Sequence, residues 1–213
     1  MCSMSRKFRQ IQEISEEAEK NKREKQEKRF QEIKEDISQQ EREQKTVEDR
    51  IRELDCKLVE IKGKNFVCER KKVAGDHISI FIFPDDVDRI IEENNIAMVT
   101  YRTLEIGTST TFLNQPSVIK NQKEFQDKLI KQYLQEKRTY YPLEAGVLKS
   151  GKYKICFAEG VFTSAVGGVF VNNFFCGGNK RTIIGNYSCR LVERYTFGNL
   201  FRAMLTQMFE EDK

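Results

Sequence analysis

The chain contains a single histidine, His77, among 213 residues. Because histidine supplies many acid–base catalysts and metal ligands, its scarcity removes the common designs of both kinds of site. The six cysteines include no C-x-x-C pair, and none lies at metal-ligand spacing from His77, which argues against structural zinc. The patterns G-x-x-x-x-G-K-[ST], G-x-G-x-x-G, G-x-S-x-G and H-E-x-x-H are also absent. We therefore expect no metal, no cofactor and no enzymatic activity.

Long apolar runs are missing as well. No segment approaches the 18 or so consecutive apolar residues of a transmembrane helix, so we expect no membrane span. Residues 1–6 lead into charged residues rather than into an apolar stretch, so no signal peptide is visible. A cytoplasmic location, where thiols stay reduced, follows as the expectation.

Glycine and proline are absent from the first 62 residues, which also hold only two of the 22 aromatic residues. About half of this stretch is charged, with 16 Lys and Arg balanced by 16 Asp and Glu, and its commonest residues favour helices. Such a segment cannot build a core of its own. The remaining 151 residues hold all 12 glycines and all three prolines. We predict a charged helical arm over residues 1–62 and an α+β globular domain over residues 63–213.

The second half of the arm carries a heptad repeat. Apolar residues and two glutamines step by three and four residues without a break from Phe30 to Ile61. This spacing predicts a coiled coil, and the polar layer at Gln40 and Gln44 can fix its register or its partner. We predict that the ten residues of this seam bind a partner protein. They are Phe30, Ile33, Ile37, Gln40, Gln44, Val47, Ile51, Leu54, Leu58 and Ile61.

The charges beside the seam disfavour the simplest dimer. In a parallel, in-register homodimer, four of the five facing pairs would carry like charges, beginning with Arg29 opposite Lys34. An antiparallel pair, a different partner and the chain's own globular domain remain as alternatives, and a marginal solvated helix is the fourth. Since basic and acidic residues alternate along the arm, we do not predict that it binds nucleic acid.

The first part of the globular domain predicts strands and two helices. Two strand-like runs flank a turn at 74–76 and predict a β-hairpin, and Gly107 separates a second strand pair. Pro84 is expected to open a short helix, and Asn121 with Glu124 to cap a longer one. The expected elements are strands at 65–73, 77–83, 97–106 and 108–113, a helix at 84–94, and a helix at 121–136 with Phe125, Leu129 and Tyr133 inward.

The rest of the chain predicts an antiparallel meander and a terminal helix. Glycine-containing turns at 150–151, 167–168 and 177–179 separate four strand-like runs. Apolar residues then follow i, i+3, i+4 spacing, which predicts an amphipathic helix lying across the sheet with its stripe in the core. The strands are expected at 145–148, 152–163, 169–176 and 181–191, and the stripe is Phe197, Leu200, Phe201, Met204, Leu205, Met208 and Phe209.

This order of elements resembles the Mog1/PsbP-like fold, an α/β/α sandwich shared by PsbP, Mog1 and the DcrB and EagR-type proteins. The resemblance covers residues 64–211 and depends on an opening hairpin that ends in Phe83-Pro84 and on the Gly167–Arg190 hairpin before the terminal helix. It implies an antiparallel β-sheet flanked by helices. It also implies a non-enzymatic protein that binds a GTPase, a photosystem or a secreted effector. The long arm departs from the family pattern, and no site residue can be carried over.

The predicted function is a non-catalytic adaptor or chaperone-like protein that binds another protein, such as a secreted or assembled partner, through the helical arm, the sheet face or both. The first alternative is a nucleic-acid-associated protein with a basic face, although a net charge of +4 is modest for that role. The residues of this basic face would be Arg70, Lys71, Lys72, Lys149, Lys152 and Lys154.

The second alternative is an enzyme in which His77 acts with a cysteine thiolate. A turn at 177–181 could hold an anion, and the aromatic pair at 140–141 could form an exposed edge for a partner. The candidate thiols are Cys156, Cys176 and Cys189.

Overall fold

The computed structural model describes residues 44–73, 78–93, 95–116, 119–164, 167–177 and 181–209. The chain divides into two compact units, Met1–Gln44 and Lys45–Lys213. Residues 1–43, most of the predicted arm, lie outside the described residues. The second unit begins at Lys45, whereas the arm is predicted to extend to residue 62. The seam residues outside the description are Phe30, Ile33, Ile37 and Gln40.

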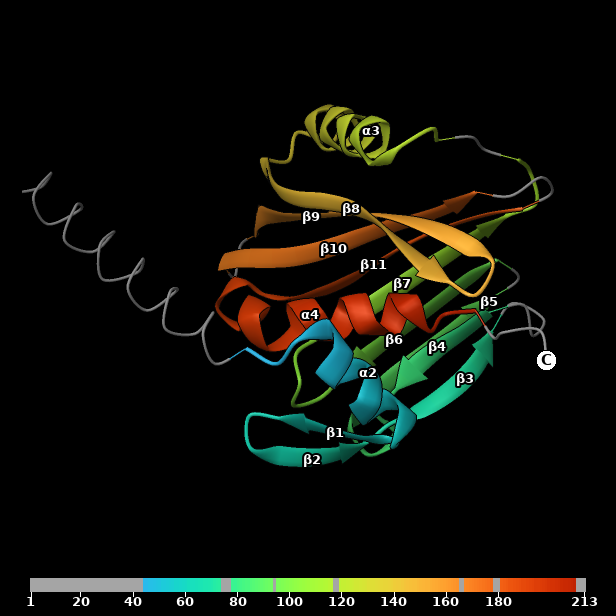
Figure 1. The fold of residues 1–213 in the computed structure, drawn as a ribbon. Coiled ribbons are helices and arrows are strands. Elements are labelled where there is room, and N and C mark those ends of the chain that lie inside the picture. Colours follow the sequence, from blue (N-terminus) through green and yellow to red (C-terminus); the bar gives the residue numbers. More distant parts are fainter. Residues whose placement is uncertain are drawn as a thin grey trace, which may run out of the picture. The chain divides into compact units, whose positions relative to one another are not determined.

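A seven-stranded antiparallel sheet forms the centre of the globular unit (Figure 1). The four C-terminal strands form the predicted meander, and β7 joins it by pairing with β11. The predicted α+β class, an antiparallel sheet flanked by helices, is confirmed. In sheet order the strands are β5 (Val87–Glu93), β6 (Ile96–Tyr101), β7 (Gly107–Leu113), β11 (Thr182–Arg190), β10 (Gly167–Gly177), β9 (Tyr153–Ser164) and β8 (Tyr140–Ser150).

Two hairpins form separate two-stranded sheets. The predicted hairpin is confirmed as β3 (Glu69–Val73) paired with β4 (Ile78–Ile82). The other hairpin, β1 (Leu58–Ile61) with β2 (Lys64–Val67), was not predicted. Its two-residue turn, Lys62-Gly63, has φ angles of 53° and 72°. Positive φ at both turn residues is the conformation that matches the twist of a tight hairpin, so Gly63 closes a hairpin rather than the arm.

Within the described residues, the predicted arm is helical only in α2 (Val47–Asp55). The helix ends at Cys56, and Lys57 adopts a left-handed φ of 57° that turns the chain into β1. The predicted helix is therefore wrong for Leu58 and Ile61. The spacing of three residues between Leu58 and Ile61 is compatible with a heptad. In the structure Val59 and Ile61 are buried while the residue before each of them is exposed, and this alternation is that of a strand.

The predicted short helix at 84–94 is also wrong. A single 3-10 turn, η1 (Pro84–Asp86), is followed directly by β5. The buried Asp86 carboxylate accepts hydrogen bonds from the backbone N–H groups of Thr103 at 3.1 Å and Leu104 at 3.0 Å, which holds the turn against the loop after β6. The residues after the turn include three β-branched ones, which favour a strand once β6 offers a pairing partner.

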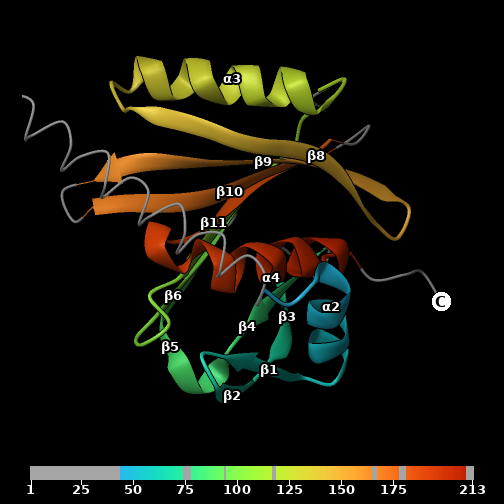
Figure 2. The same cartoon turned by 60° about the vertical axis from the view of Figure 1, so that its left-hand side comes forward.

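Helix α3 (Gln122–Gln135) covers the β8, β9 and β10 side of one sheet face (Figure 2). The Asn121 side chain accepts a hydrogen bond from the backbone N–H of Glu124 at 2.9 Å, which confirms the predicted cap. The Glu124 carboxylate accepts from the backbone N–H of Lys120 instead of from that of Asn121. As predicted, Phe125 and Leu129 point inward, into a small core beneath the helix.

Helix α4 (Arg194–Thr206) follows the 3-10 turn η2 (Leu191–Glu193) and crosses the opposite face of the sheet (Figure 2). All seven residues of the predicted stripe are buried, so that prediction is confirmed. The Phe201 ring stacks on those of Phe197 and Tyr187, with centroids 5.8 Å and 5.1 Å away. The core around α4 also takes in side chains from α2, β1, β3 and β4.

Candidate functional site

Five of the ten seam residues lie in α2 and β1. Four of these five pack into the core of the chain's own domain, and Leu58 alone among them is exposed. Packing on the chain's own domain was one of the alternatives for the seam, and it holds for this part. The four packed residues are Val47, Ile51, Leu54 and Ile61.

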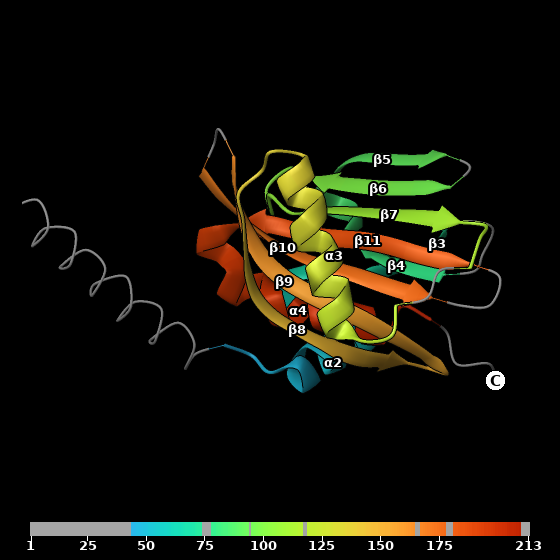
Figure 3. The same ribbon diagram turned by 90° about the horizontal axis from the view of Figure 1, so that it is seen from above.

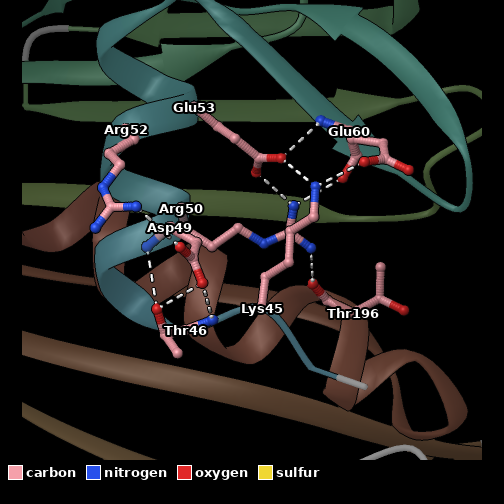
Figure 4. Close-up of polar contacts among 8 residues, drawn as sticks. All are labelled: Lys45, Thr46, Asp49, Arg50, Arg52, Glu53, Glu60 and Thr196. Atoms are coloured by element: carbon pink, nitrogen blue, oxygen red, sulfur yellow. Dashed lines mark hydrogen bonds and ion pairs between the residues drawn. The ribbon is translucent and has the colours of Figure 1, made fainter.

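The start of α2 is held at three backbone positions, two of which belong to the capping box drawn in Figure 4. The Thr46 hydroxyl accepts a hydrogen bond from the backbone N–H of Asp49 at 3.1 Å, and the Asp49 carboxylate accepts from the backbone N–H of Thr46, also at 3.1 Å. This capping box satisfies N–H groups that have no partner inside the helix. One residue earlier, the Asn199 side chain of α4 donates to the backbone carbonyl of Lys45 at 2.9 Å. The point where the chain enters the domain is therefore fixed.

Arg50 joins α2 to two other elements. One end of its buried guanidinium donates to the Glu60 carbonyl of β1 at 2.7 Å, and the other end donates to the Thr196 carbonyl of α4 at 3.0 Å. The same group makes an ion pair with Glu53 at 2.7 Å. Hydrogen bonds from a charged donor are among the stronger ones in proteins, so this side chain ties α2 in place.

Lys45 completes a charge-balanced group, which we call the anchor cluster: Lys45, Arg50, Glu53 and Glu60 (Figure 4). Its ammonium group pairs with Glu53 and, at 2.8 Å, with Glu60. Burial acts to lower the pKa of Lys45, but the bonds to the two carboxylates outweigh it and raise that pKa. Burial likewise acts to raise the pKa of Glu53, and the bonds from Lys45 and Arg50 outweigh it and lower that pKa.

The lowered pKa of Glu53 predicts sensitivity to acid. Its contribution to the free energy of unfolding is complete above 4.5, the ordinary pKa of glutamate, and is lost as the pH falls through the lower folded-state value. We expect the melting temperature of the full chain to fall as the pH drops below about 4.5, and Glu53→Gln to weaken that dependence. Glu48→Gln, on the exposed side of the same helix, is the control. An unchanged pH profile in the Glu53 variant would contradict the assignment.

The thiol candidates lie in strands and are buried. Cys156 is in β9, Cys176 in β10 and Cys189 in β11, and burial raises the pKa of each thiol, that of Cys176 to about 11. A raised pKa disfavours the thiolate that a nucleophile needs. His77, the predicted base, lies outside the described residues.

The predicted basic face is partly occupied by contacts within the domain. The Arg70 guanidinium lies 5.1 Å from the centre of the Phe81 ring, and Lys71 makes an ion pair with Glu92 at 3.4 Å. Lys149 and Lys154 lie directly opposite each other on β8 and β9. Most of the predicted anion-holding turn, residues 178–180, lies outside the description.

The predicted aromatic edge divides between core and surface. The Tyr140 ring stacks on Tyr133 of α3, with centroids 4.5 Å apart and planes 7° apart. Gly160 leaves the space for this ring, because an added Cβ there would lie 2.3 Å from it. Tyr141, the next residue of β8, is exposed.

One buried ionic network was not predicted. The Arg202 guanidinium of α4 makes two bonds to the Glu159 carboxylate of β9, at 2.6 Å and 2.7 Å, and two to the Glu144 carboxylate of β8, at 2.6 Å and 3.3 Å. Although burial acts to lower it, these bonds raise the pKa of Arg202. Asn172 also donates to Glu159, at 3.1 Å. The only signal in the sequence is that Glu159 interrupts the otherwise uncharged run from 155 to 162.

Two further observations concern the described part of the chain alone. There, no helix is both long enough and apolar enough to cross a bilayer. The same residues include no group of three or more His, Cys, Asp or Glu side chains placed to hold a metal ion.

Comparison with known proteins bears on the fold. No model of a protein family matches the chain, and no curated protein matches it. The solution structure of cyanobacterial PsbP from Synechocystis matches 66% of this chain and 91% of its own, with a TM-score of 0.53 and 11% identity. The domain has a Mog1/PsbP-like fold.

Two other solved structures are similar at lower scores. A protein of unknown function from Pseudomonas aeruginosa matches 68% of this chain and 99% of its own, with a TM-score of 0.44 and 5% identity. A protein from Bacteroides thetaiotaomicron matches 68% of this chain and 48% of its own, with a TM-score of 0.42 and 11% identity. The resemblance of the Mog1/PsbP-like domain to PsbP extends to the fold alone, so what this chain binds must follow from its own residues.

Proposed function

We propose that this protein is a non-catalytic adaptor or chaperone-like protein of the cytoplasm, which binds another protein through the seam residues that precede α2. The observation that carries the proposal is the anchor cluster with the capping box beside it. Together they hold the chain at Lys45, so a partner bound just before that residue would be attached at a defined point on the domain. A Mog1/PsbP-like fold is compatible with a binding role.

The part of the seam that remains for a partner is short. Since Val47 and the later positions belong to the domain, only residues 30–44 are left, which is close to the lower limit for a stable isolated helix. A partner surface would therefore supply much of the stabilisation of this segment. The polar layer at Gln40 and Gln44 favours a partner with matching polar groups.

The non-catalytic part of the proposal is supported by the thiols. Cys156, Cys176 and Cys189 are buried, and the raised pKa of each keeps it protonated at neutral pH.

A full-length variant with Phe30→Glu, Ile33→Glu and Ile37→Glu tests the seam. Each change places a charge where an apolar side chain should meet the partner, so we expect at least a tenfold loss of captured partner. The measurement is affinity capture from the source cells, quantified by mass spectrometry. The matched control carries Gln31→Glu, Ser38→Glu and Gln39→Glu, which add the same charge at positions off the seam.

All three proteins should melt at the same temperature, because the changes lie outside the globular unit. Capture of the same partners in the same amounts by the seam variant would overturn the proposal. Loss of capture by the control variant as well would assign the effect to charge rather than to the seam.

A further inference from the structure

Strand β8 forms one edge of the seven-stranded sheet. It pairs with β9 on one side, and within the described residues no strand pairs with its other side (Figure 3). The opposite edge strand, β5, exposes Asp88, Arg89, Glu92 and Glu93, and exposed charges of this kind protect an edge from pairing with another chain. In β8 the charged residues are Glu144 and Lys149 alone, and Pro142 with the register shift beside it protects only the first part of the edge.

Exposed apolar side chains follow the β8 edge. Tyr141 is 57% exposed, Leu143 is 44% exposed and Val147 is 46% exposed. A register shift between Pro142 and Ala145 interrupts the pairing with β9, and Pro142 has no N–H to offer. The longest regular stretch of the edge is therefore the six residues from Ala145 to Ser150. A stretch of that length, with unpaired backbone groups and apolar neighbours, fits an added strand.

The charges at the two ends of β8 are basic. Lys149 lies directly opposite Lys154, and like charges in that arrangement destabilise a strand pair. Lys137 and Arg138 are exposed just before the other end of the strand, where Arg138 pairs with Glu136 at 3.7 Å and Lys137 leaves an excess of positive charge. The one acidic residue of β8, Glu144, pairs with Arg202, which also pairs with Glu159. An occupant with acidic residues at both of its ends would relieve the repulsion and complement both ends.

We propose that β8 is a strand-addition site for an extended segment of a partner protein, with apolar residues at alternate positions and acidic residues at both ends. The proposal rests on the protein-binding function proposed above, and it adds a second contact surface on the domain itself. Backbone hydrogen bonds would supply affinity, and Tyr141, Leu143 and Val147 with the flanking cations would supply selectivity.

The test uses the full chain and a fluorescent peptide, Glu-Asp-Val-Thr-Val-Thr-Val-Asp-Glu, with binding followed by anisotropy. We expect saturable binding that weakens as salt rises, because the flanking charges are exposed and screened. Two further peptides carry N-methyl groups at alternate residues, one at the odd-numbered positions and the other at the even-numbered positions. One of these two phases of methylation should abolish binding and the other should preserve it, since the N–H groups of only one edge of the peptide face β8. Equal binding of both phases would overturn strand addition.

Variants separate β8 from other apolar surface. Leu143→Ser with Val147→Ser should weaken binding about tenfold. The matched control is Leu58→Ser with Val67→Ser on the β1–β2 hairpin, because those residues are 45% and 46% exposed, close to their β8 counterparts. The control should bind within about twofold of the wild type. Equal losses in the two variants would overturn the placement on β8.

A further variant tests whether the basic side chains of β8 and β9 are needed to bind the acidic peptide. Lys149→Glu with Lys154→Glu should weaken binding of the acidic peptide about tenfold and favour a version with lysines at its ends. A single-stranded oligonucleotide that binds more tightly than the peptide and loses binding in this variant would replace the proposal with a nucleic-acid site. Conversion of a wild-type dimer to a monomer by Leu143→Ser with Val147→Ser would identify a second copy as the occupant.

The two proposals fail separately. If the peptide does not bind but the seam variant still loses its partner, the β8 site is wrong and the seam function stands. If the peptide binds as described while the seam variant captures partners normally, the β8 site stands and the seam function is wrong.

Discussion

Arg202→Met is expected to lower the free energy of unfolding by about 3 to 5 kcal/mol, the range for breaking one side of a buried ion pair. The reason is the Glu159 carboxylate, which is 6% exposed and accepts two bonds from this guanidinium. Without Arg202, the described contacts leave Glu159 with the Asn172 amide alone. The measurement is urea denaturation of the full chain, followed by circular dichroism.

Two further variants decide whether the buried carboxylate is the cause. Glu144→Gln removes only the exposed partner of Arg202, so it should cost about 0.2 to 1 kcal/mol, as for surface pairs. Glu159→Leu combined with Arg202→Met should recover most of the loss, because apolar side chains of similar volume can replace a buried pair. A double variant no more stable than Arg202→Met would show that packing against Phe157, which the guanidinium also covers, matters more than the charge.

The elements that could be predicted are those in which the spacing of apolar residues fits only one type of secondary structure. The stripe from Phe197 to Phe209 fits a helix and not a strand, and the glycine turns divide the meander into strands. The helix is confirmed as far as Thr206, and Met208 and Phe209 are buried just after it. The four-stranded meander is confirmed, but Gly167 and Gly168 begin β10 instead of forming the turn before it. The antiparallel sheet and the Mog1/PsbP-like fold followed from that order of elements.

The elements that were missed depend on contacts between distant residues. A spacing of three from Leu58 to Ile61 fits a heptad as well as a strand, and the choice is made by pairing with β2 across the Lys62-Gly63 turn. Residues 87–93 become a strand because β6 lies beside them. Local propensity is a weak guide where a neighbouring strand supplies the backbone partners.

The candidate site was predicted in part. The seam pattern marked Val47, Ile51 and Leu54 as apolar positions of one helix face, and the structure places them against the core. Nothing in the sequence indicated that Arg50 would be buried, since its partner carbonyl on Thr196 lies 146 residues away. Buried charges of this kind depend on tertiary placement, which residue spacing does not encode.

Arg50→Met is expected to cost about 2 to 4 kcal/mol, because three hydrogen bonds from a buried charge are lost at once. The Glu60 and Thr196 carbonyls lose a charged donor, while Glu53 keeps Lys45. The loss of stability should be greatest around α2 and β1, in addition to its effect on the whole domain. Hydrogen exchange of residues 47–61 should rise more than that of β9 to β11, because α2 and β1 are the elements released.

Arg52→Met is the matched control. Its side chain is on the same helix but is 78% exposed and, among the described residues, bonds to Asp49 alone, at 3.4 Å, so the free energy of unfolding should change by less than about 0.5 kcal/mol. If the anchor cluster couples the seam to the domain, Arg50→Met should also weaken partner capture at temperatures where the domain remains folded. A variant that loosens residues 47–61 yet captures partners normally would show that the seam binds independently of its anchor, and the fixed entry point at Lys45 would then be a feature of stability alone.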